Sequence, residues 1–168
     1  MPERAGRGQA WMWFAIAAAV AVLDFLSKLA VLASLAPGER VPLTGFLNLV
    51  LVFNKGAAFS FLAAQPGWQT PLFAAIALGA SGFICWLLWR QPEKTLFCTG
   101  LALILGGALG NLYDRLVYGH VVDFVDLHVA GWHWPAFNLA DSGISVGAVL
   151  LIVESFLQRE EAPRGKSA

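Results

Sequence analysis

The sequence predicts an all-α membrane protein with four transmembrane helices and a small β-platform on the outer side of the bilayer. Hydrophobic residues make up 58% of the 168 residues and charged residues only 13%, whereas soluble domains average roughly 45–50% and 25%. The mean hydropathy is +0.65. A soluble fold of this length could not bury so much apolar surface, so an integral membrane protein remains.

Four stretches reach the roughly 20 apolar residues that a helix needs to cross a bilayer. The first follows Arg4 and Arg7 and so resembles a secretory signal, but it is about twice as long as a signal's apolar core. It also carries Asp24 and Lys28, so we interpret it as a retained helix. We expect a single membrane domain over 1–168, with spans at about 10–36, 71–89, 95–118 and 137–157.

Basic residues and tryptophans indicate how the spans are oriented. Most Lys and Arg residues that flank the four spans fall on one side, which by the positive-inside rule is the cytoplasmic side. Both termini are therefore expected in the cytoplasm, with segments 37–70 and 119–136 on the outer side. The tryptophans fall at the predicted interfaces, where amphipathic rings prefer to lie. The basic residues on the cytoplasmic side are Arg4, Arg7, Arg90, Lys94, Arg159, Arg164 and Lys166.

The two outer segments differ in character. Val41–Phe53 is apolar but too short to span, and its β-branched and aromatic residues favour a strand. We expect it to form the β-platform on the membrane. The segment 119–136 is expected to be a second outer loop or helix that Trp132 and Trp134 anchor at the interface.

Small residues and cysteines are assigned structural roles. Gly106 and Gly110 form a small-xxx-small pair that lets two helices approach closely. The same role is expected of Gly79 and Gly82 in the second span. The two cysteines match no zinc or redox spacing and are expected to be free thiols. Eleven basic residues balance eleven acidic ones, so no basic surface for nucleic acid is predicted.

Polar residues gather toward the outer ends of the spans. A charge at the centre of a span costs about 2.5–3.5 kcal/mol on insertion scales. Ionisable residues within spans therefore tend to mark a functional site. Asp123 and Asp126 follow in one outer segment, and Asn54 and Lys55 lie in the other. Three span ends and two segments thus place polar groups in one layer. The polar residues within the spans are Asp24, Lys28, Asn111, Asp114, Arg115, Asn138 and Asp141.

Two of the aspartates stand out. Asn138, Asp141 and Ser145 share one helix face, and Asp141 lies about 6 Å from the start of its helix. Asp123 follows the third span within a few residues, so Asp123 and Asp141 are expected to meet near the outer boundary. Neither aspartate has a basic partner nearby in sequence, and a joint catalytic or transport role remains for them.

The other charged residues have structural interpretations. The spacing of Asp24 and Lys28, i and i+4, predicts an ion pair that offsets the cost of insertion. Asp114 and Arg115 at a helix end are expected to form hydrogen bonds there. Asp126 is interpreted as a solvated loop residue.

Paired carboxylates suit acid–base chemistry, because two neighbours cannot easily both ionise and so share a proton. The ionised one can activate water, and the protonated one can donate to a peptide carbonyl. A metal site built from His120, His128 and His133 with the aspartates is an alternative, although no His-Glu-x-x-His motif is present. A proton relay through Asp24, Lys28 and Asp141 in a small transporter, or a non-catalytic assembly subunit that packs through its glycines, are further alternatives.

Four sequence blocks together with Asp24 and Lys28 resemble the signature of bacterial lipoprotein signal peptidase (signal peptidase II). The resemblance extends from about Trp11 to Leu157 and keeps the family's order. The blocks are Asn54–Ser60, Gly107–Arg115, Val122–Phe124 and Phe137–Ser142.

The resemblance implies an aspartic endopeptidase of the bacterial cytoplasmic membrane, with its active site on the outer side. Its substrates are prolipoproteins that carry diacylglycerol on a cysteine, and it cuts just before that cysteine. It uses no metal or organic cofactor and is the target of the cyclic peptide globomycin. We expect a monomer in contact with membrane lipids.

The same resemblance assigns roles to individual residues. Asp123 and Asp141 become the catalytic pair. The residues implied to bind substrate or support the site are Asn54, Gly56, Asn111, Arg115, Asn138, Asp24 and Lys28.

Overall fold

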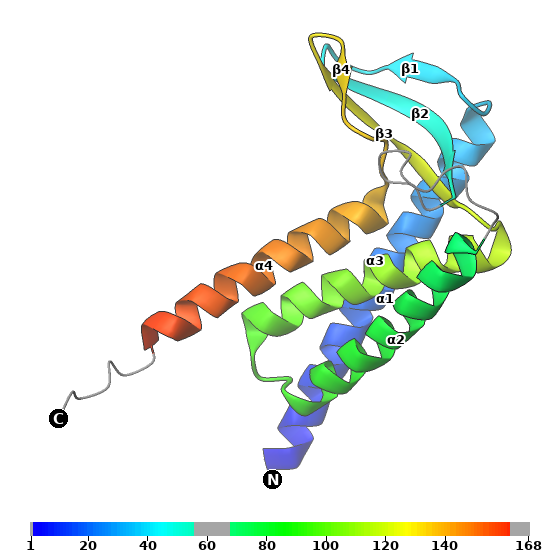
Figure 1. Ribbon diagram of the computed structural model, residues 1–168. Helices are drawn as coiled ribbons and strands as arrows, with labels where there is room; N and C mark the ends of the chain where they lie inside the picture. Colours follow the sequence, from blue (N-terminus) through cyan, green and yellow to red (C-terminus); the bar gives the residue numbers. More distant parts are fainter. Residues whose placement is uncertain (1, 56–67, 162–168) are drawn as a thin grey trace.

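The structure is a computed structural model that describes residues 2–55 and 68–161. Within these residues four long helices lie below a small antiparallel sheet (Figure 1). In chain order the elements are α1 Pro2–Ser34, β1 Arg40–Pro42, β2 Leu47–Asn54, α2 Gln69–Arg90, α3 Thr95–Val117, β3 Val121–Val129, β4 Trp132–His133 and α4 Leu139–Glu161.

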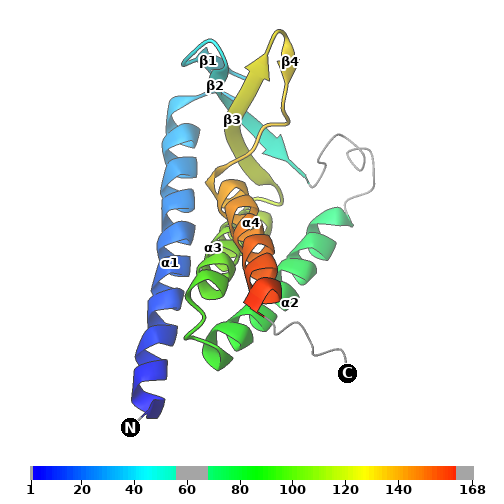
Figure 2. The same ribbon diagram turned by 90° about the vertical axis from the view of Figure 1, so that its left-hand side faces the viewer.

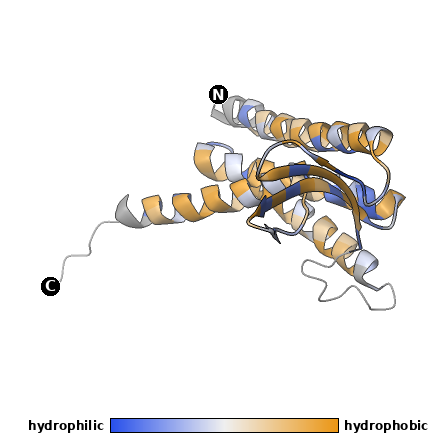
Figure 3. Cartoon of the chain, turned by 90° about the horizontal axis from the view of Figure 1, so that it is seen from above, coloured by the Kyte–Doolittle hydropathy of each residue, from blue (hydrophilic) through white to orange (hydrophobic). Residues whose placement is uncertain are grey.

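Each helix contains a segment that is long and apolar enough to cross a membrane. The sheet lies at one end of the helices, and α1 begins at the opposite end (Figure 2). Seen from above, hydrophobic residues predominate on the helices (Figure 3). The prediction of four spans with a small sheet outside them is therefore confirmed, while the extent of the domain stays a prediction. The span segments are Gly8–Ser34, Thr70–Arg90, Thr95–Val117 and Leu139–Gln158.

Helix α3 is the centre of the bundle and packs against the other three helices. In its most apolar window 61% of the residues are buried, against 22%, 22% and 11% in α1, α2 and α4. Glycines make this possible: a Cβ on Gly106 would lie 2.5 Å from the Ala17 carbonyl oxygen, and one on Gly107 would collide with the Ala140 carbonyl oxygen. In lipid no hydrophobic effect drives helices together, so a bundle is stabilised by close van der Waals packing at small residues.

The expected close contact at Gly79 and Gly82 in α2 is wrong. A Cβ on either residue would meet nothing within 4 Å. Both glycines are exposed, because α2 turns Ala74, Ser81 and Ile84 toward the bundle and leaves the glycine face outside.

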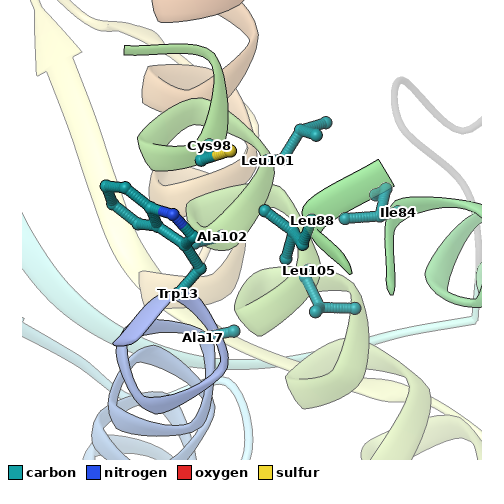
Figure 4. Close-up of a cluster of buried hydrophobic side chains, with 8 residues drawn as sticks. All are labelled: Trp13, Ala17, Ile84, Leu88, Cys98, Leu101, Ala102 and Leu105. Atoms are coloured by element: carbon teal, nitrogen blue, oxygen red, sulfur yellow. The ribbon is translucent and has the colours of Figure 1, made fainter. Parts of the chain in front are cut away.

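The end of the bundle far from the sheet is held by an apolar cluster from α1, α2 and α3 (Figure 4). The indole Nε1 of Trp13 donates a hydrogen bond of 2.9 Å to the Pro92 carbonyl oxygen and so ties α1 to the α2–α3 connection. Cys98 lies in this cluster, and both cysteines are free, as predicted. The cluster comprises Trp13, Ala17, Ile84, Leu88, Cys98, Leu101, Ala102 and Leu105.

The sheet has the strand order β1-β2-β3-β4, with each neighbouring pair antiparallel. The strand expected over Val41–Phe53 is present as β1 and β2. A second apolar cluster of Val31, Leu51, Val122 and Phe124 joins the sheet to the end of α1. The sheet is therefore fixed on the bundle at the end where the polar residues gather.

The loop or helix expected over 119–136 is wrong in its secondary structure, since this segment forms the hairpin of β3 and β4. Ala130 and Gly131 connect the strands, and both have positive φ, 49° and 83°, as in the tight turns that join antiparallel strands. The first four residues of β3 are all buried, so the hydrophobic alternation typical of a strand with one exposed face is missing there.

Candidate active site

The segment before α4 is held against β3 by backbone hydrogen bonds. The amides of Phe124 and Val125 donate to the Phe137 carbonyl oxygen at 3.0 and 2.8 Å, and the Phe137 amide donates to the Val125 carbonyl oxygen at 3.1 Å. Residues far apart in the chain are thereby held side by side. The next residue, Asn138, lies beside Asp123.

Asn138 connects the two aspartates that the sequence singled out. Its Nδ2 donates to Asp123 Oδ1 at 2.8 Å, and its backbone amide donates to Asp141 Oδ2 at 3.2 Å. Its Oδ1 accepts a hydrogen bond of 2.9 Å from the Asp141 amide. The last two bonds form a reciprocal capping box at the start of α4. The structure thus brings Asp123 and Asp141 into hydrogen-bond contact with the same asparagine.

Asp141 is surrounded by groups that stabilise a negative charge. Besides the Asn138 amide on Oδ2, the Nδ2 of Asn111 in α3 donates to its Oδ1 at 2.8 Å. Asp141 lies in the first turn of α4, where the helix dipole is positive. The Arg115 guanidinium also interacts electrostatically with it. All of these contacts favour an ionised carboxylate that accepts hydrogen bonds.

Asp123 lies in a drier environment, since only 1% of its surface is exposed. Burial, together with the nearby charge of Asp141, raises the pKa of Asp123 to about 7. Hydrogen bonds from Asn138 and from Asn54, whose Nδ2 lies 3.0 Å from Asp123 Oδ2, act in the opposite direction, as does the charge of Lys28. Asp123 therefore holds a proton at neutral pH more readily than an ordinary aspartate.

Arg115 is a cation whose charge acts on both aspartates. Its Nη1 donates to the Asn111 carbonyl oxygen at 3.1 Å, and its Cζ lies 5.4 Å from the centroid of the Phe73 ring in α2. Its charge interacts with Asp141, Asp123 and Asp114. Phe73 is a site neighbour that sequence reasoning missed, because an apolar residue in a span carries no signal of its own.

The predicted ion pair between Asp24 and Lys28 is present, with Lys28 Nζ 2.7 Å from Asp24 Oδ2. The same nitrogen lies 2.8 Å from Asp114 Oδ2 and 3.0 Å from Asn111 Oδ1. The structural role expected of Asp114 is therefore larger than a helix-end hydrogen bond, because it reaches across to α1. Asp114 carries a signal in the sequence, since it shares a helix face with Asn111.

The interpretation of Asp126 as a solvated loop residue is wrong. It is 4% exposed and accepts hydrogen bonds from Asn48 Nδ2 at 2.8 Å and from His133 Nδ1 at 2.8 Å. Arg40 Nε lies 3.4 Å away. Burial raises the pKa of Asp126, but the hydrogen bonds from Asn48 and His133 and the charge of Arg40 outweigh it and leave the pKa below its usual value. Asn48 lies directly opposite Asp126 in the sheet, so these residues hold β2 to β3.

Gly56, one of the predicted site residues, lies outside the described residues. Across residues 2–55 and 68–161, no group of three or more His, Cys, Asp and Glu side chains is arranged to hold a metal ion. Two of the histidines considered as metal ligands have protein partners instead. His133 binds Asp126, and the centroid of the His120 ring lies 4.4 Å from that of Phe53.

The family described as "Signal peptidase (SPase) II", peptidase family A8, matches residues 16–157. The chain belongs to the signal peptidase II family. Membership confirms the resemblance and the enzyme class predicted from the sequence, an aspartic endopeptidase. Together with the four span-length helices, it makes the chain a multi-pass membrane protein of a bacterial family.

Curated relatives of this family are similar over most of their length. A lipoprotein signal peptidase of Ralstonia nicotianae is 58% identical over 84% of this chain and 82% of its own. Those of Burkholderia vietnamiensis and of Janthinobacterium sp. strain Marseille are 57% and 54% identical, each over 84% of this chain and 86% of the relative.

Two solved structures share the fold. Each is described as a bacterial membrane enzyme. One matches with a TM-score of 0.78 at 26% identity and covers 94% of this chain and 93% of the other. The second matches with a TM-score of 0.75 at 28% identity over 85% and 91%. The likeness over nearly the whole chain supports the four-helix bundle with its sheet.

Proposed function

We propose that Asp123 and Asp141 are the catalytic pair with which this signal peptidase, which removes signal peptides from prolipoproteins, cleaves substrates that carry a lipid. The class of substrate follows from the family and from the lipoprotein signal peptidases to which the chain is similar. One observation supports the residue roles above all others: Asn138 hydrogen bonds to both carboxyl groups, one through its side chain and one through its backbone.

The two environments assign opposite protonation states. Asp141 accepts hydrogen bonds from Asn111 and Asn138 and lies at a helix N-terminus, so it is the ionised member. Asp123, with its pKa raised to about 7 by burial and by the charge of Asp141, is the protonated member. Environments that separate the titrations of two carboxyl groups assign their acid and base roles.

Peptide cleavage then follows as a balanced sequence of proton transfers. Asp141 takes a proton from water as the water oxygen attacks the scissile carbonyl carbon, and Asp123 donates its proton to the carbonyl oxygen. When the tetrahedral intermediate collapses, Asp141 gives its proton to the leaving nitrogen and Asp123 recovers one from the intermediate's hydroxyl group. Both aspartates return to their starting states. These steps require no metal or organic cofactor.

The supporting residues hold the pair in place. Asn54, Asn111 and Asn138 each donate an amide hydrogen to one of the two carboxyl groups. Arg115 supplies a positive charge near both, which favours negative charge that develops on the substrate carbonyl. Gly56 remains in this set as a prediction from the family signature.

The position of the site agrees with a lipidated substrate. Asp123 and Asp141 lie where α3 and α4 meet the sheet, at the end of the span segments. A cysteine whose acyl chains are in the bilayer presents its peptide bonds at this depth, which agrees with the cut just before that cysteine that the resemblance to the family implies. We infer that the protein lies in the cytoplasmic membrane as a monomer surrounded by lipids, with both termini inside and the site outside. A cyclic peptide of the globomycin type would bind at the same pair.

A relay of protons or ions across the membrane is less well supported. Such a path needs polar groups through both leaflets. The end of the bundle away from the sheet is filled by the apolar cluster around Trp13 and Leu101.

The direct test is a cleavage assay with purified enzyme on a diacylated lipobox peptide. The parent should cleave it and leave its unlipidated twin intact, whereas Asp123→Asn and Asp141→Asn should be inactive with unchanged folding. Asp126→Asn is the matched control, because it removes a buried aspartate of the sheet that contacts neither member of the pair. Parental activity in either Asp123→Asn or Asp141→Asn would overturn the proposed pair.

A further inference from the structure

Lys28 is a buried ammonium group with three side-chain oxygens within 3.0 Å of its nitrogen. Its side chain is 3% exposed, and Nζ lies 2.7 Å from Asp24 Oδ2, 2.8 Å from Asp114 Oδ2 and 3.0 Å from Asn111 Oδ1. A lysine has three donors and no acceptor, so Asn111 Oδ1 accepts a hydrogen bond from it while the two carboxylates pair with its charge. The partners come from α1 and from two turns of α3.

Each of the two carboxylates on Lys28 binds a backbone amide next to a catalytic aspartate. Asp24 Oδ1 accepts a hydrogen bond of 2.9 Å from the Ala140 amide, the residue before Asp141. Asp114 Oδ2 accepts one of 3.0 Å from the Val122 amide, the residue before Asp123.

The third partner contacts the catalytic pair directly. Asn111 directs its Oδ1 toward Lys28 and its Nδ2 toward Asp141 Oδ1, at 3.0 and 2.8 Å. Lysine only donates, and Asn138 Nδ2 also donates to Asn111 Oδ1 at 3.1 Å, so Lys28 and Asn138 together fix which end of the amide faces Asp141. With the amide reversed, two oxygens would face each other and Asp141 would lose a donor.

We propose that Lys28 is a positioning residue that holds both catalytic aspartates at their working separation through Asp24, Asp114 and Asn111. This inference rests on the proposed function. The three connections link α1 to the start of α4, to the start of β3 and to the Asp141 carboxylate. Removing the ammonium group takes away the contact with all three partners at once, which no single mutation of a partner does.

The inference predicts a defect in chemistry and not in substrate binding. Lys28→Met keeps a side chain of similar length without its charge, and a displacement of about 1 Å at a reacting group lowers the rate by roughly 100-fold. We therefore expect kcat to fall by about that factor while KM stays within about two-fold.

The pH profile gives a second readout. The charged groups that face Lys28 are Asp24 on its own helix and Asp114 on α3, and its charge also reaches Asp123 on β3. Since the charge of Lys28 lowers the pKa of Asp123, its removal should move the alkaline limb of kcat to higher pH. A purely structural role would lower the amount of folded enzyme and leave this limb in place.

Two further variants complete the experiment. Asp24→Asn/Lys28→Met removes one charge of each sign and keeps an oxygen that can accept from the Ala140 amide, so it supplies the same measurements if the single variant does not fold. Lys94→Met, an exposed lysine before α3, is the matched control and should behave as the parent.

The outcomes separate the two hypotheses. If the parent fails to cleave the diacylated peptide, the proposed function fails. If the parent cleaves it, the proposed function stands. The positioning role of Lys28 is then refuted by any of three results in the Lys28 variants: a parental kcat, a loss of activity through KM alone, or a loss of kcat with an unmoved alkaline limb.

Discussion

Asn138 has two separable roles, because its side-chain oxygen caps α4 and its side-chain nitrogen binds Asp123. Serine caps a helix about as well as asparagine does, but its hydroxyl group is too short to replace the amide donor. Asn138→Ser therefore keeps the cap and loses the contact with Asp123. Asn138→Ala loses both.

The magnitudes follow from the contacts that each substitution removes. Loss of the cap costs about 1 kcal/mol, and loss of Nδ2 leaves the buried Val122 carbonyl oxygen without its 3.2 Å contact, at about 1–3 kcal/mol. Asn138→Ala should thus destabilise the protein by about 2–4 kcal/mol. Asn138→Ser should recover about 1 kcal/mol of this.

Activity should depend on the side-chain nitrogen of Asn138, which binds Asp123. Both variants should lose at least about 100-fold in kcat, because Asp123 and Asp141 are no longer connected. Unfolding in detergent measures the loss of stability, and cleavage of the diacylated peptide below the unfolding temperature measures the loss of kcat. If Asn138→Ser regained activity in step with stability, Asn138 would be only a helix cap and our reasoning on the site would be wrong.

Four other outcomes are expected. The cleavage rate should decline as pH rises through about 7, where Asp123 loses its proton. A rate that keeps rising above pH 8 would contradict its role as the acid. Because the pKa of Asp123 is raised in the folded state, its contribution to stability is complete below about pH 4 and is lost as pH rises through 7. Gly110→Ala should lower activity and reduce the free energy of unfolding by about 1–3 kcal/mol, because its Cβ would lie 2.5 Å from Asp24 Oδ2. Gly82→Ala is the control: a Cβ there meets open space, so this variant should match the parent in the same unfolding and cleavage assays. Cleavage rates should be unchanged in Cys85→Ala and Cys98→Ala, since neither thiol forms a disulfide. A chelator such as EDTA should leave the rate unchanged, and inhibition reversed by added zinc would favour the histidine alternative.

The helical part of the fold could be predicted because its signals are local. Span length and apolar composition identify four helices, and the i, i+4 spacing of Asp24 and Lys28 identifies their ion pair. Likewise, Asn138 and Asp141 share a helix face at any position of that helix in space. These features depend on residues within one or two turns of each other.

The parts that were missed depend on contacts between distant segments. Asp126 is expected to be solvated until β2 places Asn48 opposite it. Val121–Val129 lacks strand alternation because its first half is covered on both faces. Gly79 and Gly82, like Gly106, are glycines within an apolar span, but α2 turns them away from the bundle. No local pattern reports which face of a helix a neighbour covers.

The protonation of the two aspartates tests the central claim most directly, and infrared difference spectra of the purified enzyme in membranes can measure it. Between pH 5 and 9 we predict one carboxylic acid band that disappears with a midpoint near 7, that is absent in Asp123→Asn and that persists in Asn48→Ala, a change confined to the sheet. A spectrum in which Asp123 is already ionised at pH 5, or in which the band belongs to Asp141, would contradict the claim.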